Sequence, residues 1–131
     1  MASKHDVYKV KSVATKELIK KYENAGYYFR FQDKKQRLTC RSKSWGMIYS
    51  SAKEAERDGS TVLNGKSCVS KAKDLVRWCC EFDSTFHVVI VFKGTWMEYG
   101  HDGEDVARYE GLIDVFDYDQ FCNVAFESEE E

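Results

Sequence analysis

The chain has 131 residues and a net charge of −2, with 43% hydrophobic and 32% charged residues. These values are typical of a globular protein and exclude a disordered or fibrous chain, so we expect one domain over 1–131 with an acidic tail at 127–131. The longest apolar run, 88–92, is far shorter than the roughly 20 residues of a membrane span, and the N-terminus lacks a signal-peptide core, so no membrane partner is expected.

The five cysteines have neither metal-ligand nor disulfide spacing, which favours reduced thiols and a cytoplasmic location. The charge is unevenly distributed along the chain. Residues 1–80 carry 18 Lys and Arg against 8 Asp and Glu, whereas residues 81–131 carry 2 against 14. Two interpretations stay open. In one, the basic part forms a face that binds phosphate and the acidic part binds the basic face of another copy. In the other, oppositely charged strands are neighbours in one sheet.

The first third of the chain predicts a helix among strands. Alternating apolar and polar residues over 7–13 predict a half-buried strand, and a capped amphipathic pattern predicts a helix over 15–24. The segment 27–32 reads as a strand, with 36–42 as its return strand in a hairpin and 46–49 as a third short strand.

The middle of the chain predicts two helices and a central strand. A capping box opens a helix over 51–57, residues 65–68 read as a turn, and the strongest helical pattern covers 71–82. The continuous apolar run of 87–92 is typical of a strand that is buried on both faces.

The C-terminal part continues this sheet. Residues 95–99 extend the central strand, 100–105 form a loop, and 106–109 with 112–116 form a final strand or pair of strands, followed by a helical turn at 119–121. The pattern predicts the α+β class, with an antiparallel β-sheet and two main helices packed on one side.

The segment 27–45 is rich in basic and aromatic residues. On a strand, Tyr27 and its alternate neighbours face the core, which leaves Tyr28 and Arg30 on the opposite face, joined across the hairpin by Arg37 and Arg41. Guanidinium groups bind phosphate and aromatic rings stack on bases, so this face is a candidate for one half of a binding site for an anionic ligand. A solvated outer sheet face is the alternative.

A second candidate follows the central strand. Thr95 offers a hydroxyl to phosphate and Trp96 offers a stacking surface. The acidic loop that comes next suggests either a metal site or contacts to ribose hydroxyls, and a Gly-rich acidic turn without a ligand is the alternative. Its candidate ligating residues are His101, Asp102, Glu104 and Asp105.

No strong catalytic signature is present in the sequence. Residues 65–67 lack the spacing of a phosphate loop, and a thiol–imidazole pair of Cys68 with His87 is easily found by chance. We therefore expect a protein that is not an enzyme and that uses no cofactor or metal.

Several short segments follow one another in a recognisable order: Asn24-Ala25-Gly26-Tyr27-Tyr28, Tyr49-Ser50-Ser51 with Glu54-Ala55, Gly65-Lys66-Ser67-Cys68, Leu75-Val76-Arg77-Trp78, 89–94 and 100–105. Over about residues 7 to 121, this succession resembles the first type of Thoeris anti-defence protein, a phage-encoded sponge that sequesters cyclic nucleotide signals.

The resemblance implies a function and a set of contacts. It implies a homo-oligomer, from dimer to hexamer, that binds cyclic ADP-ribose isomers and cyclic oligonucleotides without hydrolysis and thereby counteracts anti-phage defence in an infected bacterial cell. It also implies that Arg30 and Thr95 contact phosphate. Further contacts implied by position are Phe92, Trp96, Arg77, Asp105 and Arg108.

Two other functions stay open. One is a small enzyme that resembles ADP-ribosyltransferases, with Arg30 or Arg41, the segment 49–51 and Glu104 in the roles of that family's Arg, Ser and Glu. The other is a phage inhibitor or adaptor that binds a host protein or nucleic acid. The net charge of −2 argues against nucleic acid as the partner.

Overall fold

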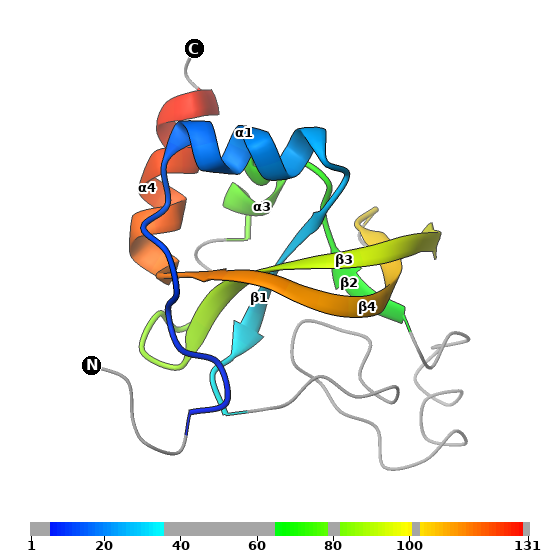
Figure 1. The fold of residues 1–131 in the computed structure, drawn as a ribbon, viewed down its shortest axis with the longest axis horizontal. Coiled ribbons are helices and arrows are strands. Elements are labelled where there is room, and N and C mark those ends of the chain that lie inside the picture. Colours follow the sequence, from blue (N-terminus) through cyan, green and yellow to red (C-terminus); the bar gives the residue numbers. More distant parts are fainter. Residues whose placement is uncertain (1–5, 36–64, 79–81, 101–102, 130–131) are drawn as a thin grey trace.

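The computed structural model describes residues 6–35, 65–78, 82–100 and 103–129. The predicted α+β class is confirmed, because a four-stranded antiparallel sheet is combined with helices on one side of it (Figure 1). The elements are α1 Lys16–Asn24, β1 Tyr28–Asp33, β2 Gly65–Cys68, α3 Ala72–Val76, β3 His87–Tyr99, β4 Asp105–Phe116 and α4 Tyr118–Glu129. In the described part of the chain, no helix is long and apolar enough to cross a membrane.

The sheet has the strand order β1-β3-β4-β2, with all neighbours antiparallel. β3 and β4 form a long hairpin; β1 pairs with the first half of β3, and β2 pairs with the first half of β4. Just after β2, Val69 exchanges both backbone hydrogen bonds with Phe29 of β1, each at 2.9 Å. Because this bridge joins the two edge strands, the sheet curls back on itself, and one of its faces becomes an interior surface.

One face of the sheet packs against the helices. Phe29 and Phe31 of β1 point to this side, where Ile19 of α1, Leu75 of α3 and Phe121 of α4 complete a buried cluster. Side chains of β1 alternate between the two faces of the sheet, and the phenylalanines predicted to face the core do lie in it.

The other side of the sheet, which we call the inner face, has its own buried cluster. Residues directly opposite each other on antiparallel strands share a face, so the register defines this set. The inner face consists of Tyr28, Arg30, Gln32, Lys66, Cys68, Val88, Ile90, Phe92, Trp96, Asp105, Ala107, Tyr109 and Val115, with Tyr8 packed over it.

Two predicted elements are corrected at the start of the chain and in its middle. Residues 7–13 form no strand: four of their backbone N–H groups donate in two adjacent pairs, one to the Lys34 carbonyl and one to the Val115 carbonyl, and build no ladder. Residues 65–68, predicted as a turn, form β2, because pairing with β4 overrides the weak strand propensity of Gly and Ser.

Two helices differ from the prediction in length. The helix predicted over 71–82 is shorter: α3 ends at Val76, and Trp78 N–H bonds to Leu75 only three residues back. The predicted turn at 119–121 belongs to the much longer α4, and most of the predicted acidic tail continues this helix. The elements predicted over 36–42, 46–49 and 51–57 lie outside the described residues.

Side-chain hydrogen bonds join the N-terminal segment to α4 and join α1 to the sheet. The Gln120 side-chain amide on α4 clamps Ala14, accepting from its N–H at 2.6 Å and donating to its carbonyl at 2.5 Å. Tyr22 on α1 donates to the Asp114 carboxylate on β4 at 2.6 Å, and Asp114 is only 3% exposed. Each contact joins residues about a hundred positions apart, so the fold depends on long-range polar contacts as well as on its core.

The Tyr22–Asp114 contact predicts a pH dependence. Burial, followed by the hydrogen bond to Asp114, raises the pKa of Tyr22 to about 12, against 10 for the ordinary phenol. Since the folded protein holds this proton more tightly, the contribution is complete below pH 10 and is lost as the pH rises towards 12. Urea unfolding of Tyr22→Phe and wild type should show a stability difference that shrinks over this interval, whereas a constant difference would contradict the assignment. Tyr99→Phe, at an exposed position, is the control.

Candidate functional site

Arg30 is the central charged residue of the inner face. It pairs with Ile90 of β3 and is 0% exposed. The expectation that Tyr28 and Arg30 lie on an outward, solvated face is therefore wrong for Arg30, while Tyr28 is half-buried. The physical reason is the curl of the sheet, together with Tyr8, which belongs to the cluster that covers this face.

Burial decides the electrostatics around Arg30. Desolvation lowers the pKa of its guanidinium to about 10, partly opposed by the neighbouring Cys68 and Tyr8, so Arg30 is still a cation at neutral pH. Burial also raises the pKa of the Cys68 thiol far above its ordinary value, which keeps it protonated at neutral pH. This part of the inner face thus combines a buried positive charge with an inert thiol.

Lys66 adds a second basic side chain to the same face. It lies opposite Ala107 in the β2–β4 register and is 1% exposed. Lysine and arginine are almost never fully buried in proteins without compensating interactions, so two of them on one sheet face are unusual. Lys66 is not among the residues predicted from the sequence, because residues 65–68 have the composition of a turn. The alternation of Lys66 and Cys68 is the signal that indicates a shared face.

Three aromatic rings form a row across the inner face, which we call the aromatic row. Phe92 is central: its ring centroid lies 5.7 Å from Tyr28 in a stacked arrangement and 5.5 Å from Tyr109 in a tilted one. Phe92 is fully buried, whereas Tyr28 and Tyr109 are only half-buried. The row therefore extends from the interior to the surface at both ends, as a surface for stacking requires.

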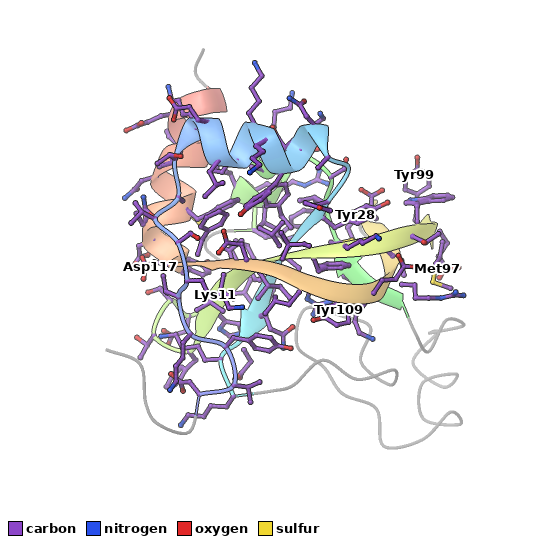
Figure 2. The ribbon with its side chains drawn as sticks, in the orientation of Figure 1. Lys11, Tyr28, Met97, Tyr99, Tyr109 and Asp117 are labelled. Atoms are coloured by element: carbon purple, nitrogen blue, oxygen red, sulfur yellow. The ribbon has the colours of Figure 1, made fainter. Side chains whose placement is uncertain are left out.

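Trp96 and Asp105 lie near the end of the same hairpin. The Trp96 indole N–H donates to the Asp105 carboxylate at 3.1 Å, and Trp96 is 46% exposed. Its ring also meets that of Tyr99 edge-on, with centroids 5.0 Å apart. Figure 2 shows Tyr28 and Tyr109 beside the middle of β3 and β4, with Met97 and Tyr99 farther out at the end of the hairpin. The exposed aromatics thus continue outward from the aromatic row.

The other predicted contacts lie elsewhere. Thr95 sits opposite Arg108 and donates its hydroxyl to Glu110 at 2.8 Å, so this pair belongs to the face opposite Trp96. Arg77 stacks on the Trp78 ring at 4.2 Å beside α3, on the helix side of the sheet. The structure brings together five predicted residues on the inner face and separates three from them, while Arg37 and Arg41 lie outside the described residues. The five are Tyr28, Arg30, Phe92, Trp96 and Asp105.

The thiol–imidazole pair considered for catalysis is not formed. Cys68 pairs with Asp105, which lies opposite Tyr99, whereas His87 is at the other end of β3. The Nδ1 atom of His87 lies 3.0 Å from the carbonyl oxygen of Asp83.

The acidic loop is described only in part. Glu104 is 6% exposed and packs against Gly100, while His101 and Asp102 lie outside the described residues. Among the residues that are described, no group of three or more His, Cys, Asp and Glu side chains is placed to hold a metal ion.

Comparisons with known proteins leave the site to be judged from its own chemistry. No family model, no curated protein and no solved structure matches the chain.

Proposed function

We propose that this protein binds and sequesters a nucleotide-derived signalling molecule without converting it. One observation carries the proposal: the buried guanidinium of Arg30 shares a sheet face with the aromatic row, whose two ends are half-buried. Guanidinium groups bind phosphate through paired, charge-assisted hydrogen bonds, and an aromatic ring contributes about 1–3 kcal/mol for each base stacked on it. A ligand that places its phosphate against Arg30 and stacks its base on Tyr28 or Tyr109 uses both the guanidinium and the aromatic row.

The resemblance seen in the sequence supplies the ligand class. Cyclic ADP-ribose isomers and cyclic oligonucleotides combine phosphates with planar bases, which suits the inner face. Sequestering such signals in an infected bacterial cell would counteract anti-phage defence, and a homo-oligomer is part of the same proposal. The protonated state of Cys68 supports binding without nucleophilic attack by this thiol.

Because Arg30 is fully buried, a ligand reaches it only when a covering side chain moves. Tyr8 is a described neighbour of Arg30, and the backbone N–H groups of Val7 and Tyr8 donate to the Lys34 carbonyl at 2.7 and 3.0 Å. We therefore expect the hydrogen exchange of these two amides to change when the ligand binds.

Calorimetric titration with cyclic ADP-ribose isomers and cyclic dinucleotides tests the proposal. The expected result is saturable binding, with the ligand recovered unchanged by chromatography. An absence of heat with every ligand, while the protein is folded, would overturn it. If the protein releases nicotinamide from NAD and Glu104→Gln abolishes this release, an enzyme that resembles ADP-ribosyltransferases is favoured instead. If nucleic acid is retained in a salt-sensitive way, an inhibitor or adaptor that binds nucleic acid is favoured.

Arg30→Met gives the proposal a residue-level test. Removing one partner of a buried charged contact costs about 3–5 kcal/mol, so the folding of this variant is checked first by circular dichroism. If it does not fold, Arg30→Lys, which keeps the charge but lacks the paired donors of the guanidinium, takes its place. Loss of a charge-assisted contact of about 1.5–3 kcal/mol corresponds to an affinity loss of about 10- to 150-fold. Lys21→Met, which removes a positive charge from exposed helix surface, should bind like wild type. Equal losses in both variants would show that net charge, and not Arg30, decides affinity.

A further inference from the structure

A groove lies between α1 and the start of α3, on the helix side of the sheet and away from the inner face. Its volume is about 610 Å³, within the range of about 300–1,000 Å³ that is typical of small-molecule sites. Ile19 and Ala72, 6% and 3% exposed, provide its apolar floor. The groove therefore has the size and the partly apolar lining of a ligand site.

The charges that line the groove are mainly positive. Lys16 and Lys20 come from α1, and Lys71 and Lys73 come from the segment that opens α3. Two acidic residues, Glu17 and Glu23, also line it, which leaves a formal charge of +2. Amines from two separate elements thus face one concave space.

The two walls are held together by a hydrogen bond. The Ala72 N–H donates to the Glu23 carboxylate at 2.8 Å, so one of the two acids is already engaged by the backbone. None of Lys20, Lys71 and Lys73 forms an ion pair with another described residue. A bound anion would give these three ammonium groups a counter-charge in a groove whose walls are already positioned.

We propose that this groove is a second binding site, for a compact ligand that carries two or more phosphates. Lysine ammonium groups bind phosphate as point charges without a fixed orientation, which suits an oligophosphate chain. The small volume favours such a ligand over a protein or a nucleic-acid duplex, whose interfaces commonly bury more than about 1,000 Å². The site is independent of Arg30 and of the aromatic row.

Titration with inorganic tripolyphosphate tests this site directly. The expected result is saturable binding of one tripolyphosphate per chain that weakens as salt is raised to about 0.2 M, because exposed charges are screened. Arg30→Met should bind tripolyphosphate like wild type, so failure of this site and failure of the proposed function are distinguishable. Stronger binding of an oligoglutamate peptide or of RNA than of tripolyphosphate would overturn the assignment.

A pair of double variants with the same charge change provides the control. Lys20→Glu with Lys73→Glu reverses one lysine on each wall, and the affinity for tripolyphosphate should fall about tenfold or more. Lys21→Glu with Lys93→Glu makes the same change at exposed positions outside the groove, and the affinity should fall much less. Equal losses would mean that only the net charge matters. If either double variant fails to fold, Lys20→Met and Lys73→Met repeat the test singly.

Discussion

Phe121→Ala should lower the free energy of unfolding by about 3–5 kcal/mol, the usual cost of emptying a buried aromatic site. Phe121 is 0% exposed, and its ring centroid lies 5.8 Å from both Phe29 of β1 and Phe116 of β4. The truncation therefore removes a ring of α4 that contacts both strands. Urea unfolding followed by tryptophan fluorescence measures the change.

Phe126→Ala is the matched control on the same helix. Phe126 is 52% exposed, so its truncation should change the stability by no more than about 0.5 kcal/mol. Alanine is a better helix former than phenylalanine, so helix propensity would not explain a loss in either variant. A loss of similar size in the two variants would contradict the assignment of this energy to the packing of Phe121 on the sheet.

Gly94→Ala should cost about 1–3 kcal/mol or more, because the hairpin has no room for a side chain at this position. An added Cβ would overlap the carbonyl oxygen of Arg108 and would lie 3.0 Å from Cε2 of Phe92. The β3–β4 register also shifts between Lys93 and Gly94, so the bulge and the close approach coincide. Thermal unfolding measures the loss, and displacement of Phe92 should also weaken ligand binding on the inner face.

Gly111→Ala supplies the comparison within the same hairpin. A Cβ at Gly111 would meet no atom within 4 Å, and this glycine pairs with Lys93, directly beside the bulge. We expect a change within about 1 kcal/mol, because removing glycine also reduces the freedom of the unfolded chain. If Gly111→Ala is as destabilising as Gly94→Ala, steric overlap is not the cause.

The strands with the clearest sequence patterns were predicted correctly. The alternation of residues 27–32 and the apolar run of 87–92 match β1 and the buried half of β3, and 95–99 continues β3 as expected. These predictions hold because side-chain periodicity depends on the local backbone alone.

The sequence of α4 carries a helical pattern that is longer than the single turn predicted at 119–121. Tyr118, Phe121 and Ala125 follow helical spacing and are buried, and the Asp117 carboxylate accepts the Gln120 N–H at 3.0 Å, as an N-terminal cap does. The acidic residues that follow are also typical of a solvated tail, which is why the sequence alone predicts one at 127–131.

The N-terminal segment shows the opposite error. Residues 7–13 alternate as a strand should, yet Val7, Val10 and Val13 are 39%, 49% and 71% exposed. Alternation predicts a strand only when a neighbouring edge is available for pairing, and this depends on the whole sheet.

The sequence of β1 alone determined that Phe29 and Phe31 lie on one face of the strand and Tyr28 and Arg30 on the other. Which of these faces meets water was decided only in three dimensions. The bridge between Phe29 and Val69 joins the sheet edges, and Tyr8 packs over the side that carries Arg30. A period of two assigns a residue to a face, but burial depends on what distant parts of the chain place against it. Arg30 is therefore a buried cation beside aromatic rings, and not the exposed half of a basic hairpin.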